Sequence, residues 1–140
     1  QSKRSLILAA PFVQPSEVLH DGPLSHALQV ALRYGVNVDI VSTGSGLRTI
    51  DIQSLRSIAT GRLRFYRPLA NVDNERRLGS HAKFCIADGQ HAYIGSANLT
   101  SPGLSEHLEM GVLIHGELAS RVEQFWRFLT EIRFFVEVNL

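Results

Sequence analysis

The stretch HAKFCIADGQHAYIGSANLT, residues 81–100, carries the strongest structural signal in the chain. Two short, largely apolar runs flank the pair Asp88-Gly89, which is a common turn between antiparallel strands. The stretch therefore predicts a β-hairpin. It also carries more polar groups at regular spacing than a hairpin needs, and this excess points to a function.

The predicted hairpin would gather groups that suit a phosphodiester. Alternate residues of a strand share a face, so His81 and Lys83 are expected on one face of the first strand, and Ser96 and Asn98 on one face of the second. Gly95 has no Cβ and would let backbone or ligand approach closely. In this arrangement Lys83 and Asn98 would hold the non-bridging oxygens while the imidazole of His81 attacks phosphorus.

The residues before the hairpin alternate strands with helices. We expect a strand over residues 6–13 that ends near Pro11, a helix from Asp21 to Gly35, a strand over residues 36–43, a loop over residues 43–46, a helix over residues 52–59 and a strand over residues 63–69. This order favours an α/β layered structure with crossover connections.

The residues after the hairpin complete one domain. We expect a strand over residues 108–114 and an amphipathic helix over residues 117–133. The apolar tail, residues 134–140, is expected to form a last strand or to pack on a partner. No linker or repeated motif interrupts residues 1–140, which are therefore interpreted as a single domain. The first residue is Gln1 and not methionine, which indicates processing or a longer parent chain.

The composition is typical of a globular protein. Hydrophobic residues make up 44% and charged residues 19% of the chain, and no apolar run approaches the roughly 18 to 20 residues that span a bilayer. No signal peptide is visible, and the single cysteine, Cys85, cannot form an internal disulfide, so we expect a cytoplasmic location with no membrane partner. Cys85 is interpreted as a small buried apolar residue and not as an activated thiol.

The spacing H-x-K-x4-D-x6-G-S-x-N, from His81 to Asn98, resembles the signature of the phospholipase D superfamily. The preceding βαβαβ run and the downstream strand with Glu109 resemble one catalytic half of that fold, so the resemblance spans nearly the whole chain. It implies an α/β layered fold with a mixed β-sheet flanked by helices. It also implies a two-step phosphoryl transfer through a phosphohistidine, with no metal and no cofactor.

The resemblance assigns a role to each polar residue of the motif. It implies that His81 is the nucleophile or the acid, and that Lys83, Asn98 and Ser96 bind the phosphate. Glu109 would orient the imidazole through its other ring nitrogen.

Asp88 completes the motif but lies in the predicted turn, away from the face of His81. We expect a structural role for it more than contact with substrate. A metal site at the motif is rejected, because Lys83 would repel a cation and no H-x-x-x-H or C-x-x-C spacing is present.

The implied mechanism needs two histidines, and this chain has one H-x-K. The other histidines lack the surrounding pattern; they are His20, His26, His91, His107 and His115. His107 comes two residues before Glu109 and is the least easily dismissed. We therefore expect either a two-fold dimer in which each subunit supplies one His81, or a chain that is one half of a longer protein.

The arginines favour nucleic acid as substrate. Twelve of the fourteen cations are arginine, which binds phosphate better than lysine does, although the net charge is only +1. The predicted phosphate-binding arginines are Arg67, Arg76 and Arg77, with Arg62 and Arg64 in the same cluster as Arg67; the alternative is that they are solvated surface charges.

Three functions remain open from the sequence. The first is a nuclease acting on DNA or RNA, because the short single-motif layout resembles the small bacterial endonucleases of the superfamily. The second is a non-catalytic subunit that keeps the fold and binds phosphate or nucleic acid in a defence or repair assembly. The stretch GSANLT, residues 95–100, with the following LSEHLEMGVLI, residues 104–114, also resembles phospholipase-D-like proteins of DISARM-type antiphage systems. The third is a phospholipase.

Overall fold

The computed structural model describes residues 4–14, 22–69, 80–100 and 102–139. Its helices and strands, in chain order, are β1 (Ser5–Ala9), α2 (Pro23–Arg33), β2 (Asn37–Val41), α3 (Gly44–Arg48), α4 (Ile52–Ile58), β3 (Leu63–Pro68), β4 (Phe84–Ala87), β5 (His91–Gly95), the short π-helix η2 (Pro102–Glu106), β6 (Gly111–His115), α6 (Glu117–Glu131) and β7 (Phe135–Glu137).

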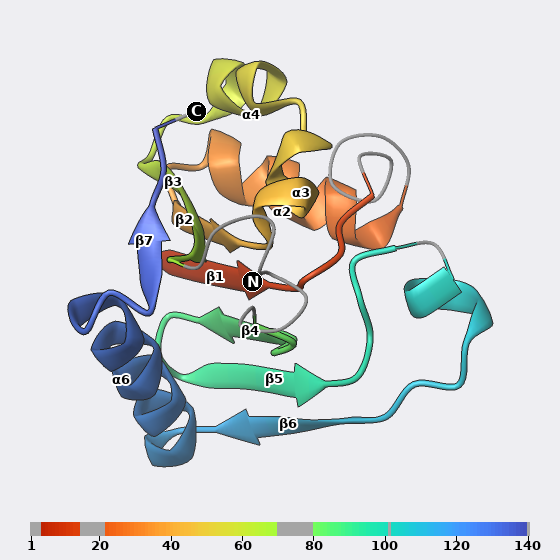
Figure 1. Cartoon of the computed structure of the whole chain (residues 1–140), viewed down its shortest axis with the longest axis vertical. Coiled ribbons are helices and arrows are strands. Elements are labelled where there is room, and N and C mark those ends of the chain that lie inside the picture. Colours follow the sequence, from red (N-terminus) through yellow and green to blue (C-terminus); the bar gives the residue numbers. More distant parts are fainter. Residues whose placement is uncertain (1–3, 15–21, 70–79, 101, 140) are drawn as a thin grey trace.

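Seven strands form one open mixed sheet in the order β6-β5-β4-β1-β2-β3-β7 (Figure 1). The neighbours β1, β2 and β3 are parallel, whereas β4, β5, β6 and β7 each join the sheet in antiparallel pairing. This arrangement confirms the predicted α/β fold with a mixed sheet flanked by helices.

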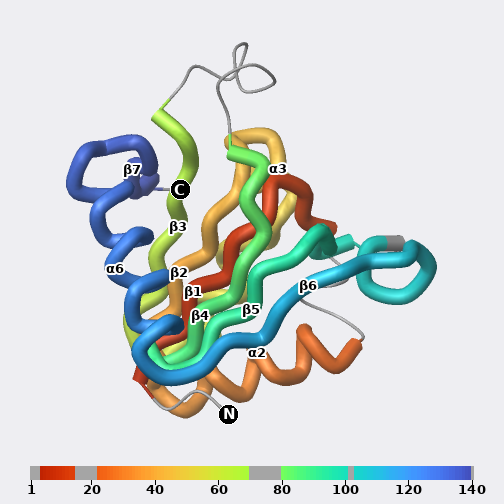
Figure 2. Tube along the Cα trace, turned by 90° about the horizontal axis from the view of Figure 1, so that it is seen from below, coloured from red at the N-terminus to blue at the C-terminus, as the bar shows by residue number. Residues whose placement is uncertain are grey.

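Two hydrophobic clusters cover the two faces of the sheet. Helices α2, α3 and α4 supply Leu28, Leu47 and Leu55 to the first cluster, which packs on β1, β2 and β3. Helix α6 supplies Trp126 to the second cluster, which also contains Ile86 of β4. Figure 2 shows α2 and α6 on opposite sides of the strands. Burying each such side chain contributes about 2 kcal/mol, so both faces stabilise the sheet.

The predicted hairpin is present, and its turn is tied to the start of β1. The turn runs from Ala87 to Gln90, whose amide donates to the carbonyl of Ala87 at 3.0 Å. Asp88 and Gly89 both have positive φ, at 56° and 65°, in the conformation that Asp and Gly tolerate best. The carboxylate of Asp88 accepts the amides of Arg4 at 2.8 Å and of Ser5. These two bonds join the turn to the start of β1, which is a structural contact of the kind expected for Asp88.

The first strand of the hairpin is shorter than predicted. β4 begins at Phe84 and not at His81, so His81 and Lys83 lie on the segment that leads into the strand. One bond of the ladder continues beyond it, because the amide of Gly95 donates to the carbonyl of Lys83 at 3.1 Å.

Residues 44–46, predicted to lie in a loop, begin the short helix α3. The hydroxyl of Thr43 caps this helix by accepting the amide of Gly46 at 3.0 Å. This cap was not predicted, because Thr43 was expected to end the preceding strand and the glycines after it are typical of a loop.

The predicted strand over residues 108–114 starts later, at Gly111. Its neighbour β5 ends at Gly95, which is the register partner of Gly111, so no strand lies opposite Leu108. The tail forms the last strand, β7, which pairs antiparallel with β3. Helix α6 ends at Glu131, two residues before the predicted end at Arg133. Arg133 itself adopts a φ of 59°, which is not helical. Among the described residues no helix is both long and apolar enough to cross a membrane.

Candidate active site

The polar motif residues other than Asp88 lie at one edge of the sheet, which we call the site edge. Here β1 ends at Ala9 opposite the first residue of β4, Phe84, and β5 ends at Gly95 opposite the first residue of β6, Gly111. The segments that enter or leave these strands therefore lie close together, although they are far apart in sequence. They carry His81, Ser96, Asn98 and Glu109.

An exposed imidazole and a buried ammonium are in contact at this edge. Nζ of Lys83 lies 3.0 Å from Nδ1 of His81 and 3.1 Å from the carbonyl oxygen of the same residue. Lys83 is only 6% exposed, whereas the His81 ring is open to solvent. Because an ammonium can only donate, Nδ1 of His81 is the acceptor, and the proton of the neutral ring is then on Nε2.

The environment of Lys83 disfavours its positive charge. Burial lowers the pKa of Lys83 from its ordinary value, and the negative charge of Glu109 opposes that effect in part. A phosphate anion bound beside the ammonium would stabilise the charged form further. The site therefore favours an anionic ligand on electrostatic grounds.

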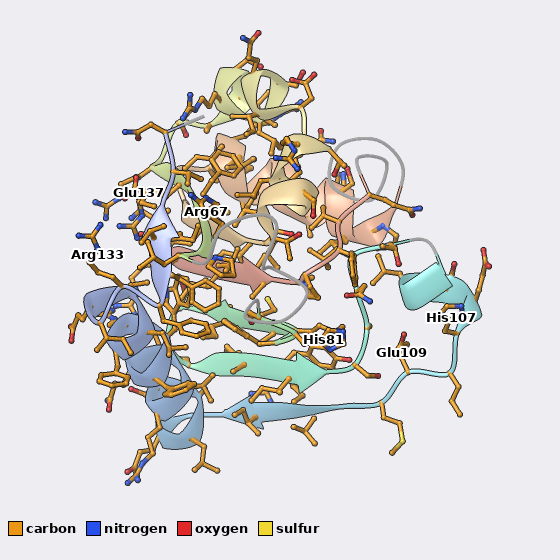
Figure 3. All side chains as sticks on the ribbon, viewed as in Figure 1. Arg67, His81, His107, Glu109, Arg133 and Glu137 are labelled. Atoms are coloured by element: carbon orange, nitrogen blue, oxygen red, sulfur yellow. The ribbon has the colours of Figure 1, made fainter. Side chains whose placement is uncertain are left out.

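Ser96 and Glu109 hold each other at the exit of β5. The hydroxyl of Ser96 donates to the carboxylate of Glu109 and accepts the amide of Met110 at 3.1 Å. The amide of Ser96 donates to the carbonyl of Met110 at 3.0 Å. Glu109 thus pairs with Ser96 here, and its predicted bond to an imidazole stays a prediction. Figure 3 shows His81 and Glu109 at the same end of β4, β5 and β6.

Asn98 brings a polar atom without a partner to the site edge. Its Oδ1 is the one buried side-chain nitrogen or oxygen for which the described part of the chain offers no hydrogen bond. The backbone beside it is fixed, because the amide of Leu99 donates to the carbonyl of Phe12, and the carbonyl of Leu99 accepts the amide of Gln14 at 2.8 Å. A buried unpaired oxygen costs about 1–3 kcal/mol, and such groups are typical of functional sites.

A cavity of about 420 Å³ opens beside His81 and Lys83. Its wall is largely apolar and comes from β4, β5, α6 and the segment of β7; the wall residues are Phe84, Ile94, Val122, Phe125, Trp126, Leu129, Phe134 and Phe135. The exposure of Phe125, at 60%, shows that part of the α6 face is free to line a binding site.

Two arginines of the predicted cluster, Arg62 and Arg64, lie away from the site edge. Arg62 and Arg64 lie where β3 begins, near the opposite edge, and Arg64 forms an ion pair with Asp39 at 2.8 Å. Because β3 runs parallel to β1, its first residues lie at the end of the sheet away from the site edge, so Arg62 and Arg64 are not placed to bind phosphate there. Arg67 also lies on β3, which β1 and β2 separate from β4, and Figure 3 shows it apart from His81. Arg76 and Arg77 lie outside the described residues.

The other predicted groups are placed as follows. None of the other described histidines hydrogen-bonds to His81 or Lys83; His91 and His115 contact each other instead. Burial raises the pKa of the Cys85 thiol to about 11, which supports its interpretation as an unreactive core residue. The described residues contain no group of three or more His, Cys, Asp or Glu side chains that could hold a metal ion.

One further residue near the motif escaped the sequence analysis. The ring of Tyr93 lies over Gly95 and Gly111, where a Cβ on either glycine would collide with it. The register explains this, since the two glycines are direct cross-strand partners beyond Tyr93. Gly95 of the motif therefore gives room to a neighbouring ring.

An open mixed sheet that brings an imidazole, an ammonium and a carboxamide to one edge suits a domain that binds and transfers phosphoryl groups. Residues 1–130 match the sequence model of a family described as the PLD-like domain of cardiolipin synthase. The chain therefore belongs to the phospholipase D superfamily, whose members act on phosphodiesters.

The sequence identity to individual curated relatives is below one third. Cardiolipin synthase B of Salmonella typhi is 29% identical over 119 residues, which make up 82% of this chain and 26% of that protein. The chain thus spans about a quarter of the length of the curated relatives it matches.

Two solved structures share the fold. Nuc of Salmonella typhimurium, a phospholipase D family member, is 20% identical with a TM-score of 0.67, and the match covers 100% of this chain and 85% of that one. NucT of Helicobacter pylori is 14% identical with a TM-score of 0.68, and the match covers 93% and 80%.

Proposed function

We propose that this chain is a metal-independent phosphodiesterase that cleaves DNA or RNA through a phosphohistidine on His81. The observation that carries the proposal is the contact between the exposed imidazole of His81 and the buried ammonium of Lys83. The imidazole is free to react, and the ammonium is placed to hold a non-bridging oxygen of the phosphate in front of it.

The contact suggests how substrate would activate the imidazole. As long as Lys83 donates to Nδ1, the proton of the neutral ring stays on Nε2 and blocks attack by that atom. A bound phosphate would draw the ammonium away, so that Nδ1 could take the proton and Nε2 could present its lone pair. A bond then forms between Nε2 and phosphorus as the bond to the leaving oxygen breaks, and a second imidazole protonates that oxygen. Water next attacks phosphorus, gives its proton to the second imidazole, and displaces His81.

The second imidazole would come from another copy of the motif, either in a second subunit or in another part of a longer protein. Ile94, Val112 and Phe125 are exposed apolar side chains of β5, β6 and α6, and two of them line the cavity beside His81. Exposed apolar surface of this kind is typical of an interface. A second copy packed there would bring its own His81 to the same phosphate.

Nucleic acid is the favoured substrate class. The chain covers most of Nuc and NucT, so a compact single-motif unit of this size resembles the small endonucleases of the superfamily. The predominance of arginine among the cations also suits a substrate with many phosphates.

A phospholipid is the second candidate, and one observation favours it. The largely apolar wall of the cavity beside His81 would accommodate an acyl chain or glycerol backbone better than a sugar. The match to cardiolipin synthase B points in the same direction.

The test compares substrates in the presence of EDTA. Single-stranded DNA, double-stranded DNA, RNA and phospholipid vesicles are each incubated with the wild type, with His81→Ala and with His26→Ala, which removes an exposed histidine of α2. The proposal expects cleavage of a nucleic acid that survives chelation, is lost in His81→Ala and persists in His26→Ala. Turnover of lipid alone would select the second candidate.

Sedimentation of the same samples decides how the site is completed. A dimer that binds nucleic acid and cleaves none of the substrates would identify the chain as a binding subunit and would contradict the enzymatic proposal. Replacing Arg76 and Arg77 together with alanine should reduce the salt dependence of binding by about two phosphate contacts. An unchanged slope would return both residues to the solvated surface.

A further inference from the structure

A pair of imidazoles lies at the end of the sheet opposite the site edge. His91 begins β5 and His115 ends β6, and the two residues are direct cross-strand partners. The neighbouring pairs on either side are hydrogen-bonded, as the amide of Gly116 shows by donating to the carbonyl of Gln90 at 2.8 Å. The histidines therefore occupy a non-hydrogen-bonded position, where opposite side chains come closest.

The two rings face each other through the same type of nitrogen. The Nδ1 atoms of His91 and His115 are 2.7 Å apart, and the rings meet edge to face with centroids 4.9 Å apart. Two imidazoles hydrogen-bonded in this way share a single proton, because one nitrogen must donate and the other must accept. Both nitrogens therefore point at one place between the strands.

We propose that His91 and His115 form a two-imidazole site for a divalent transition-metal ion of the Zn²⁺, Ni²⁺ or Cu²⁺ class. The ion would replace the hydrogen bond between the two Nδ1 atoms: the ring that donates would take up the Nε2–H tautomer, so that both Nδ1 lone pairs face the ion. With metal–nitrogen bonds of about 2.0–2.1 Å, tetrahedral ligation needs nitrogens about 3.3 Å apart. Both side chains are exposed, so small rotations of the rings provide the additional separation.

The surroundings leave room for a hydrated ion. The histidines line an open cavity of about 760 Å³ together with Arg4 and Asp88 and with apolar residues such as Leu113. Arg4 opposes a cation and Asp88 favours one, so the two charged residues of the cavity wall balance each other. Water would fill the remaining coordination positions, since the carboxylate of Asp88 already accepts two backbone amides.

The position of the site gives the ion a structural effect. β6 is the edge strand of the sheet, and an ion on both histidines would fasten it to β5. The opposite end of the same strand pair holds Ser96 and Glu109 of the site edge. Any ligand that binds the folded chain alone raises its stability, so the ion should raise the melting temperature.

The test uses the full chain without an affinity tag, titrated with Zn²⁺ by calorimetry and with Cu²⁺ by electron paramagnetic resonance. The wild type should bind one ion per chain, and the copper spectrum should show two nitrogen ligands. His91→Asn and His115→Asn should each weaken binding by about 100-fold, because the second imidazole binds intramolecularly. The double variant should bind little more weakly than either single variant, and His26→Asn, the matched control, should bind like the wild type.

Thermal unfolding with and without Zn²⁺ gives a second measurement. The ion should raise the melting temperature of the wild type and of His26→Asn and should leave that of the three pair variants unchanged, with circular dichroism confirming that each is folded. The proposal is overturned if the wild type shows no saturable binding, or if either single variant keeps the wild-type affinity.

Discussion

The two ends of the sheet differ in how completely their charged and polar side chains are hydrogen-bonded. Near the end where β1, β2 and β3 begin, Asp39 and Arg64 form a two-bond ion pair, and Asp88 accepts two backbone amides. At the site edge, Lys83 is buried with only an imidazole and a carbonyl as hydrogen-bond partners, and Asn98 has an unpaired oxygen within the described chain. The first end satisfies its charged groups, whereas the site edge leaves polar groups incompletely satisfied at a cost in stability, which agrees with the ligand site proposed there.

Lys83→Met should show the largest effect. We expect phosphodiesterase activity to fall by about 10²–10³-fold, the usual loss when one donor to a transition-state oxygen is removed. The melting temperature should not fall, because methionine removes a buried ammonium whose pKa is lowered by desolvation.

The pH dependence of unfolding sharpens this result. Burying the charged form costs stability at every pH below the lowered pKa of Lys83, and that cost shrinks to zero as the pH rises from the lowered pKa to the ordinary one. The stability difference between Lys83→Met and the wild type should therefore shrink at alkaline pH. A variant that is less stable at every pH would show that Lys83 supports the fold.

Asp39→Asn tests the opposite end. We expect a loss of about 2 kcal/mol in the free energy of unfolding, less than for a fully buried ion pair because Arg64 is partly exposed. Urea unfolding measures this loss. The specific activity of the folded fraction should stay at the wild-type level, and a greater loss would contradict the separation of the two ends.

Asp88→Ala should have a smaller effect of about 1 kcal/mol, since two amides lose their acceptor where water can partly replace it. Asp88→Asn is the matched control, because asparagine keeps an acceptor oxygen and tolerates positive φ. Phosphodiesterase activity in the folded range should be the same for both variants. A catalytic role for Asp88 would appear as a loss of activity without a loss of stability.

The smallest expected effect concerns the reactivity of the Cys85 thiol. Its pKa of about 11 keeps the thiol protonated at pH 8, so iodoacetamide should modify the folded chain slowly and the urea-unfolded chain quickly. The stability that comes from burying the neutral thiol is present below its ordinary pKa and is lost as the pH rises through 11. Fast modification of the folded chain would show that the site edge opens.

The order of the main helices and strands could be predicted from the sequence, and so could several of the residues that gather at the site edge. Local signals were sufficient for the hairpin, because the turn at Asp88 and the spacing from His81 to Asn98 lie within a single stretch. The start of β4 was missed because pairing decides it: β1 ends at Ala9, opposite Phe84, and strand alternation does not extend to His81.

The positions of some segments relative to the motif in the folded chain could not be predicted from residue types. Arg62 and Arg64 are close to the motif in sequence but lie toward the other end of the sheet, since β3 runs parallel to β1. Likewise, nothing in residues 134–140 indicates that they pair with β3 and not with a partner. Both outcomes depend on the order of strands, which local patterns do not encode.

The family match stops at residue 130, yet β7 begins at Phe135, which packs with Trp126 in the core and forms part of the cavity wall beside His81. A chain shortened to the matched length would leave one edge of β3 unpaired and would remove Phe134 and Phe135 from the wall of the cavity beside His81. The folded unit therefore extends beyond the residues that the family model matches, and fragments prepared for biochemistry should retain the final strand.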